Sequence, residues 1–180
     1  MRQRLALVVV VVLLAGLVWF LFNPPLLFVD TGEYERTNVT VYGKDGDPLA
    51  TVDVRIADTR DKRRVGLSRT DSLEFGEGML FVHGSEGSHT YVMRNMSFAL
   101  DIIFADSDGR ITTIHHAPVD GDSYDGRGKF VLEVPRGWAN ETGVTTGARI
   151  EIPSDETLDS ATTVDRLCHA PNNGSWDGMA

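Results

Sequence analysis

The segment FALDIIF (98–104), followed by the turn DSDG (106–109) and the segment ITTI (111–114), decides the fold class. Every second residue from Phe98 to Phe104 is apolar, so these side chains share one face of a β-strand. An Asp-Gly pair between two β-rich segments is typical of a hairpin turn. The sequence therefore predicts an antiparallel hairpin in this part of the chain.

Further strands are predicted on both sides of this hairpin. Val39–Val41 and Val52–Ile56 alternate in the same way around a turn at residues 44–48, which predicts a second hairpin. Many short strands separated by turn residues are typical of a mostly β domain, and we expect a compact antiparallel β-sandwich or a small barrel. The other segments predicted as strands are Met79–Val82, Thr90–Met93, Phe130–Val134 and Arg149–Ile152.

One short helix is predicted within this β domain, directly after Thr59. Thr is a residue type that caps helix N-termini through its side-chain oxygen. Asp61 lies in the first turn, and Arg63 and Arg64 lie in the later part, where their charges suit the helix dipole. The sequence is also compatible with a helical turn around Trp138.

The N-terminal segment Leu5–Phe22 contains no charged residue and is preceded by Arg2 and Arg4. As a helix it extends about 27 Å, close to the roughly 30 Å hydrocarbon core of a bilayer. We therefore expect a single transmembrane helix, with residues 1–4 in the cytoplasm and the rest of the chain outside. The alternative is a cleaved secretory signal, which would also export the chain.

The remaining chain is predicted to form a linker at 23–36, one domain at 37–152 and an acidic, mostly disordered tail at 153–180. Cys168 is the single cysteine, so no intrachain disulfide can form. Glycosylation outside the cell is compatible with the Asn-x-Ser/Thr motifs that begin at Asn38, Asn95, Asn140 and Asn173.

The charge balance excludes one class of partner. Without Arg2 and Arg4, 15 basic and 26 acidic residues give the chain a net charge of −11. Such a surface repels nucleic acids and anionic lipid headgroups, so we expect no nucleic-acid partner. The many Asp and few Lys residues resemble the acidic surfaces of proteins from salt-loving archaea, although an ordinary acidic soluble domain would look the same.

Several short blocks occur in an order that resembles a known family. They are GLSR (66–69), GMLF (78–81), YVMRNM (91–96), LDIIF (100–104) and VLEVPRG (131–137). Together they are similar to the domain of unknown function 192 family, over about Val39 to Ile152. The resemblance implies a compact, mostly β fold that is commonly exported or tethered to a membrane, and it implies no agreed activity. The chain departs from the family pattern at Ser68, Val92, Met96, Ala99 and Ala148.

Asp101 and Glu133 are the main candidate functional residues, because each is an acid within an apolar strand segment. An unpaired buried carboxylate is costly. One hypothesis brings the two acids together as a catalytic pair, or as a ligand-binding set with Arg69, Arg94 and Asn95. The alternative is structural, with each acid in a buried salt bridge or bonded to the backbone.

Histidines form a second and weaker candidate set. His83, His89 and His116 could contribute to a zinc site, but their spacing does not match a compact metal motif. His115 precedes His116 directly, so the two side chains should point to opposite faces of a strand. The acidic loop at residues 120–125 lacks the spacing of a calcium loop. We therefore expect neither a metal nor a cofactor.

The sequence leaves three hypotheses for function, because it contains no nucleophile motif, phosphate-binding loop or dinucleotide fingerprint. The first is a noncatalytic extracellular domain, held to the cytoplasmic membrane by residues 5–22, that binds a small ligand or an envelope protein. The second is an envelope enzyme that uses Asp101 and Glu133 on a carbohydrate-like substrate. The third is an assembly or quality-control accessory protein. Aromatic residues suited to line a groove or to pack in the core are Tyr91, Phe98, Tyr124 and Trp138.

Overall fold

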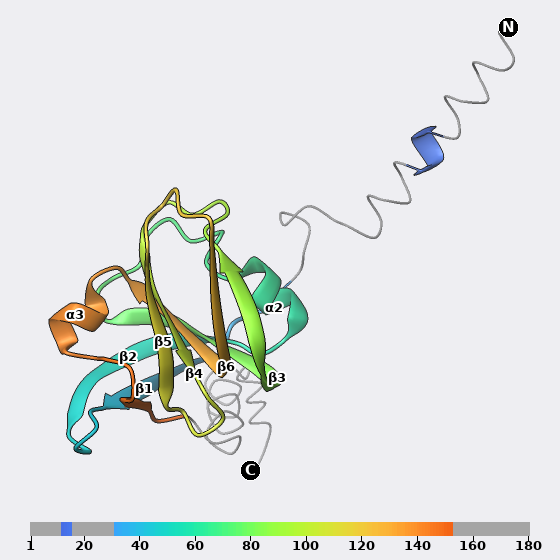
Figure 1. Cartoon of the computed structure of the whole chain (residues 1–180). Helices are drawn as coiled ribbons and strands as arrows, with labels where there is room; N and C mark the ends of the chain where they lie inside the picture. Colours follow the sequence, from blue (N-terminus) through green and yellow to red (C-terminus); the bar gives the residue numbers. More distant parts are fainter. Residues whose placement is uncertain (1–11, 16–30, 153–180) are drawn as a thin grey trace, which may run out of the picture.

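The computed structural model describes residues 12–15, which are helical, and residues 31–152 (Figure 1). Most of the predicted membrane helix and linker, and all of the predicted tail, lie outside these residues. Within the described part of the chain, no helix has the length and apolar character needed to cross a membrane. The elements are β1 (Arg36–Tyr42), β2 (Pro48–Ala57), α2 (Arg60–Val65), β3 (Glu77–Val92), β4 (Leu100–Ala105), β5 (Ile111–Ala117), β6 (Ser123–Pro135), α3 (Trp138–Thr142) and β7 (Arg149–Ile150).

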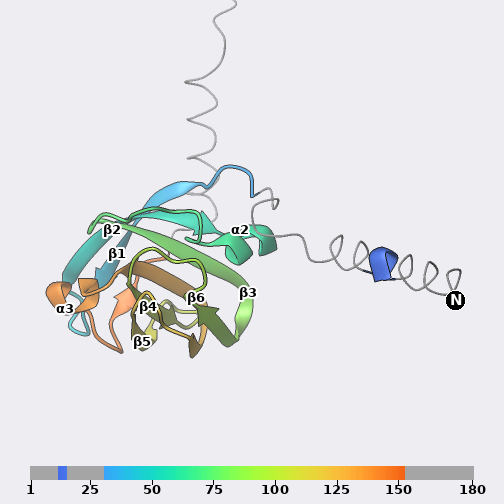
Figure 2. The same cartoon turned by 90° about the horizontal axis from the view of Figure 1, so that it is seen from above.

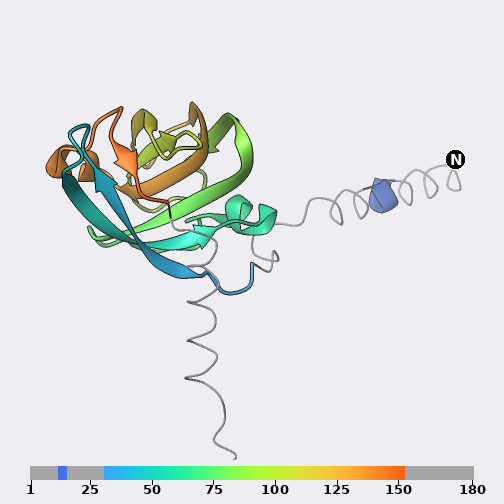
Figure 3. The same cartoon turned by 90° about the horizontal axis from the view of Figure 1, so that it is seen from below.

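The strands form one seven-stranded sheet with the order β5-β4-β6-β3-β2-β1-β7. The sheet curls around its own interior as a half-barrel, which is clear when it is viewed from above and from below (Figures 2 and 3). The prediction of a mostly β domain is confirmed. Of the two architectures expected, the β-sandwich is wrong, because no second sheet packs on the first within the described residues, and the half-barrel is closer to the small barrel.

The prediction of a wholly antiparallel arrangement is also wrong, because β2 and β3 are parallel. Parallel neighbours need a crossover connection, and α2 lies in the connection between these two strands. The two predicted hairpins are confirmed as β1–β2 and β4–β5, with Val39 opposite Val52 in the first and Ile103 opposite Ile114 in the second.

Two of the predicted strands are parts of one long strand. The sequence predicted Met79–Val82 and Thr90–Met93 as separate strands, whereas β3 continues through both. Its partner β6 begins at Ser123, before the predicted start at Phe130. The two strands pair as far as Val92 opposite Ser123, with an irregularity between Val82 and Gly87. Backbone pairing thus extends the strands through polar and glycine-rich sequence that lacks the apolar alternation of a strand.

The ends of the sheet meet at one place, where the start of β5 lies beside β7. Ile111 N donates to Ala148 O and Ile150 N donates to Gly109 O, each at 2.8 Å. Gly109 has a φ of +78°, and a Cβ atom built on it would lie 2.3 Å from the Ile150 carbonyl oxygen. This position therefore requires glycine both for its backbone angle and for the close approach of the two strands.

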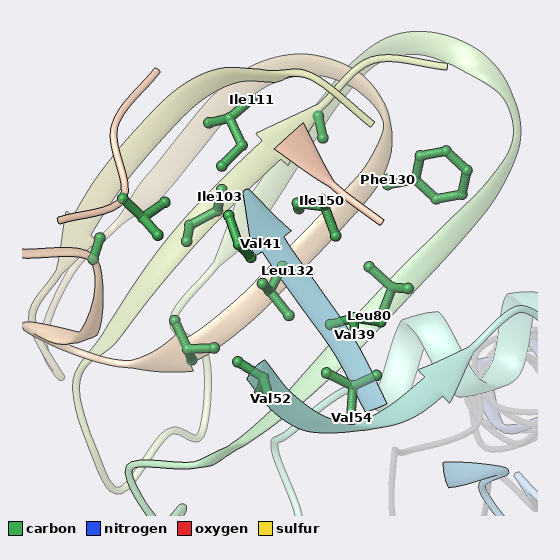
Figure 4. Close-up of a cluster of buried hydrophobic side chains, with 14 of the residues drawn as sticks. Val39, Val41, Val52, Val54, Leu80, Ile103, Ile111, Phe130, Leu132 and Ile150 are labelled. Atoms are coloured by element: carbon green, nitrogen blue, oxygen red, sulfur yellow. The ribbon is translucent and has the colours of Figure 1, made fainter. Parts of the chain in front are cut away.

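Apolar side chains pack on both faces of the curled sheet. The cluster inside the curl contains Val39, Val52, Leu80, Ile103 and Leu132 among others (Figure 4). A second cluster covers the other face, and its buried members are Ala57, Leu67, Met79, Phe81, Met93, Leu100, Ile102, Phe104, Ala117 and Val131. Because both faces are covered in the middle of the sheet, the Asp101 side chain on β4 and the Glu133 side chain on β6 are both buried.

Two short helices flank the sheet, with α2 beside β3 and α3 on the opposite side of the molecule (Figures 1 and 2). The predicted cap of α2 is confirmed, since the Thr59 hydroxyl accepts a hydrogen bond from Lys62 N at 3.2 Å. The helical turn that the sequence allowed around Trp138 is present as α3, so the domain has two short helices where one was expected. Burial of Trp138, which is 1% exposed, holds this helix against the core inside the curl.

We predict that Gly109→Ala destabilises the domain more than Gly46→Ala. Gly46 also has a positive φ, +87°, but a Cβ atom there meets nothing within 4 Å. The control substitution should therefore cost about 1 to 2 kcal/mol of unfolding free energy from backbone strain alone. The clash with Ile150 should add about 1 to 3 kcal/mol to the cost of the first substitution. Chemical denaturation measures both, and equal losses would contradict a tight contact at this position.

Candidate functional site

Asp101 has a structural role that explains its place in β4. Its Oδ1 atom lies 2.6 Å from His116 Nδ1 on β5. Its Oδ2 atom accepts hydrogen bonds from Gly137 N at 3.1 Å and Ala139 N at 2.9 Å. The side chain is 0% exposed. Asp101 therefore caps the N-terminus of α3 from a neighbouring strand, since the residue in the capping position of the helix itself is Gly137.

Asp101 and Glu133 lie on opposite faces of the sheet. In the pairing of β4 with β6, Asp101 is opposite Val134, and Glu133 is opposite Ile102. Because neighbouring residues of a strand point to opposite faces, the Asp101 side chain points into the curl and the Glu133 side chain points out of it. The expectation that these two acids converge on one site is therefore wrong.

A cavity of about 530 Å³ opens on the outer face of the sheet, where Glu133 lies. It is lined by the end of α2 and the residues after it, by β3 and by the segment that follows β3. The buried members of the lining, which include Phe81 and Leu100, mark its inner end. The exposed members, which include Arg64, Val92 and Arg94, mark its mouth.

The Glu133 carboxyl group reaches the inner end of this cavity without a partner. The residue is 7% exposed and lies in β6 between Met79 and Ile102. No hydrogen bond or ion pair joins its side chain to any other described residue. Every fully enclosed side-chain polar atom among the described residues does have a partner, so the Glu133 carboxyl must open onto the cavity. Burial raises the pKa of this carboxyl from 4.5 to about 8.

Two histidines and a tyrosine form a ring cluster in the wall of the cavity. His83 and His89 stack with their ring centroids 3.5 Å apart, and His83 Nε2 lies 3.0 Å from the Tyr91 hydroxyl. Burial, helped by His89 and Arg63, lowers the pKa of His83 from 6.5 to about 4. Burial also raises the pKa of Tyr91, and the charge of Glu133 raises it further. His83 is therefore a neutral ring and Tyr91 a neutral phenol at ordinary pH.

Cationic side chains surround the same cavity. Arg63 is held by the backbone, because its Nη1 atom donates to the carbonyl oxygens of Asp58 and Val82, the second at 2.8 Å. Arg94 lies in the exposed segment after β3, and no described residue bonds its guanidinium group. The cavity thus has an acid at its inner end and an arginine available at its mouth.

The structure brings together only some of the predicted site residues. Glu133, Arg94, His83 and His89 line the cavity, whereas neither Arg69 nor Asp101 does. The residues predicted from sequence that lie elsewhere are Asn95, which has a φ of 58° in a turn, and His116, which contacts Asp101. Tyr91 was predicted either to line a groove or to pack in the core, and it lines the cavity. Arg63 was not predicted to have a site role, because nothing in the sequence indicates that it reaches β3.

The described residues contain no group of three or more His, Cys, Asp or Glu side chains arranged to hold a metal ion. His115 contacts the Asp125 carbonyl through Nε2 at 2.9 Å, and its partner in sequence, His116, contacts Asp101. The proposed acidic loop is partly strand, because Asp125 lies in β6 and accepts a hydrogen bond from the Thr90 hydroxyl at 2.6 Å. The side chains of His115, His116 and Asp125 therefore make contacts between strands.

Comparison with known proteins gives a family and a fold. Residues 41–152 match the model of the DUF192 family, which is described as an uncharacterized ACR. A proposed transcription regulator from Sinorhizobium meliloti 1021, known from a crystal structure, is 29% identical in sequence to this chain. Its structure matches with a TM-score of 0.63 over 68% of this chain and 97% of that one. A protein of unknown function from Novosphingobium aromaticivorans DSM 12444 is 30% identical, with a TM-score of 0.60 and coverage of 65% and 85%. No curated protein matches the chain.

We predict that Glu133 makes the free energy of unfolding fall as pH rises from about 4.5 to about 8. In this window the folded state retains the Glu133 proton, whose pKa is about 8, and the unfolded state loses it near 4.5. The slope from one proton is at most about 1.4 kcal/mol per pH unit. Glu133→Gln should remove it, so that the variant gains stability over the wild type as pH rises.

The measurement is chemical denaturation at a series of pH values, reported as the difference between variant and wild type. His83 contributes a slope of opposite sign between about pH 4 and 6.5, because its folded pKa is lowered, but this contribution cancels in the difference. The exposed Glu141→Gln substitution serves as the control and should give a flat difference. A flat difference for Glu133→Gln as well would show that its carboxyl is not buried.

Proposed function

Since the chain belongs to the DUF192 family, we propose for it a function that the family description leaves open: a noncatalytic, membrane-anchored extracellular domain that binds a small ligand in the Glu133 cavity. The observation that carries this proposal is the buried Glu133 carboxyl, which has no partner among the described residues and opens onto a cavity of about 530 Å³. Cavities of roughly 300 to 1,000 Å³ are the usual size for small-molecule sites.

A ligand that bonds Glu133 would offset an energetic cost that its burial imposes on the folded domain. A polar group that is buried without a hydrogen bond lowers stability, typically by about 1 to 3 kcal/mol. An apolar residue at this position would pack against Met79 and Ile102 without that cost. A ligand that bonds the carboxyl would recover the lost interaction. The cavity therefore combines apolar side chains with polar and charged groups that a ligand could bond.

The geometry does not favour the alternative of a two-carboxylate enzyme. Such an enzyme needs both acids beside one substrate bond, about 5 to 10 Å apart in a common cleft. Asp101 faces the interior of the curl and uses both of its oxygens to bind His116 and the start of α3. The name of the Sinorhizobium relative does not extend to this chain either, because a net charge of −11 outside the first four residues opposes nucleic-acid binding.

The proposed location rests on the sequence of the first 22 residues. Leu5–Phe22 is uncharged, and Arg2 and Arg4 precede it, which favours a cytoplasmic N-terminus. The acidic composition supports a second part of the proposal, namely that the domain works in a salty medium, where a strongly charged surface remains hydrated. An intact anchor and a cleaved signal would place the domain on the same side of the membrane.

We predict that the purified full chain enriches a small molecule from an extract of its own cells. The measurement is equilibrium dialysis against the extract, followed by mass spectrometry of the compounds retained. Ser88→Trp should abolish the enrichment, because Ser88 is exposed and lines the cavity, so that a large side chain there blocks it. The control is Thr51→Trp, at an exposed strand position away from the cavity. Enrichment of nothing, or equal enrichment by both variants, would contradict the proposal.

We also predict that protease added to intact cells digests the domain, whereas a variant without residues 1–22 stays in the cytosol and is protected. The physical reason is that the apolar segment directs export, and that the two arginines retain the N-terminus inside. Immunoblotting of fractionated cells measures both results. Protection of the full chain in intact cells, with full digestion after lysis, would overturn the proposed location.

A further inference from the structure

We infer that the Glu133 cavity takes a zwitterion of the amino-acid type, with its ammonium group at Glu133 and its carboxylate at Arg94. This inference rests on the proposed function, because it names the chemical class of ligand for the same cavity. Three features of the cavity support it: the buried Glu133 and the exposed Arg94 in its lining, the apolar side chains in the same lining, and its size.

The inner end of the cavity is suited to an ammonium group. Glu133 is an acid with no partner among the described residues, and the groups that accompany it in the lining include the Tyr91 hydroxyl and the neutral ring of His83. An ammonium group brings three hydrogen-bond donors and a positive charge, so it satisfies the carboxylate. The attraction between two charges is much stronger in a buried site than in water.

The mouth of the cavity is suited to an anionic group. Arg94 is exposed and lacks a bonding partner among the described residues, and Arg64 is also exposed there. Arg63 adds a third positive charge close to His83 and Tyr91. A ligand with a positive charge alone would be repelled by this rim, and one with a negative charge alone would leave Glu133 unsatisfied. A ligand that carries both charges matches both ends.

The lining also contains apolar side chains beside its polar and charged ones. It includes Val65, Leu67, Phe81, Met96 and Leu100. These side chains favour a ligand with an apolar part, and burial of that part contributes roughly 25 cal/mol for each Å² removed from water. A volume of about 530 Å³ leaves ample room for one amino acid with an apolar side chain, or for a short peptide. Leucine and phenylalanine are therefore the natural probes.

The test is isothermal titration calorimetry of the full chain with leucine and phenylalanine, and with two analogues of leucine that each keep one charge. The analogues are 3-methylbutylamine, which lacks the carboxylate, and 4-methylpentanoate, which lacks the ammonium group. We expect a zwitterion to bind at least tenfold more tightly than either analogue. Glu133→Gln should weaken zwitterion binding at least tenfold and leave the binding of 4-methylpentanoate unchanged.

Arg94→Gln provides the complementary variant and does not depend on the folding of a core substitution, because Arg94 is exposed. It should weaken zwitterion binding at least tenfold and leave the amine unaffected. Arg136→Gln is the matched control at an exposed arginine outside the cavity, and it should bind as the wild type does. Circular dichroism of each variant establishes that it is folded.

Proton release provides a second readout. Near pH 7 the Glu133 carboxyl is protonated in the empty cavity, since its pKa is about 8. An ammonium group favours the ionised form, so binding should release up to about one proton, and Glu133→Gln should release none. The other titratable or charged groups of the site are Tyr91, His83, His89, Arg63, Arg64 and Arg94, and all remain in Glu133→Gln. Titration in buffers of different ionisation enthalpy measures the proton count.

The outcomes separate this inference from the proposed function. Equal binding of a zwitterion and a single-charge analogue, or binding that Glu133→Gln and Arg94→Gln leave unchanged, would overturn the inference. Failure of both amino acids to bind, while dialysis still enriches a compound that Ser88→Trp excludes, would also overturn it and leave the proposed function intact. If neither experiment detects a ligand, both proposals are wrong.

Discussion

The pairing of β3 with β6 is the constraint on which the rest of this structure depends. The two strands pair over most of their length, and an irregularity after Val82 lets β3 change course before it pairs again at Gly87. Through this change His83 stacks on His89 and reaches Tyr91, although six to eight residues separate them in sequence. The same pairing places Glu133 opposite Met79. A shift of one residue in β6 would move its carboxyl to the other face.

The two buried acids show how alternation along strands assigns different roles to similar residues. Asp101 faces the interior of the curl, where His116 and the backbone of α3 satisfy both of its oxygens, so its burial stabilises the fold. Glu133 faces the outer layer, where no described residue bonds it, so its burial opposes folding. Sequence alone presents them as equivalent, because each is a single acid within an apolar strand. The pairing register of the strands decides that Asp101 caps a helix and that Glu133 is available to a ligand.

Features that depend on neighbouring residues were predictable from the sequence, and features that depend on distant ones were not. Alternation and turn residues gave the β1–β2 and β4–β5 hairpins, and Thr59 gave the cap of α2. The parallel pairing of β2 with β3 and the polar half of β3 depend on distant strands, and no local pattern signals them. For the site, Glu133 was identifiable as an acid in an apolar segment, whereas the contact of Tyr91 with His83 requires the bend in β3.

Burial of Glu133 lowers the stability of the folded state, and it adds little further cost when a ligand binds. The carboxyl is already largely withdrawn from bulk water before a ligand binds, and its raised pKa keeps it neutral and limits the penalty. A ligand that supplies a positive charge therefore has to overcome only the modest cost of removing one proton, and it meets a carboxylate held in place by two strand pairings. On a chain with a net charge of −9, simple cations gather everywhere on the surface. The arginines at the mouth give this cavity a means of excluding them.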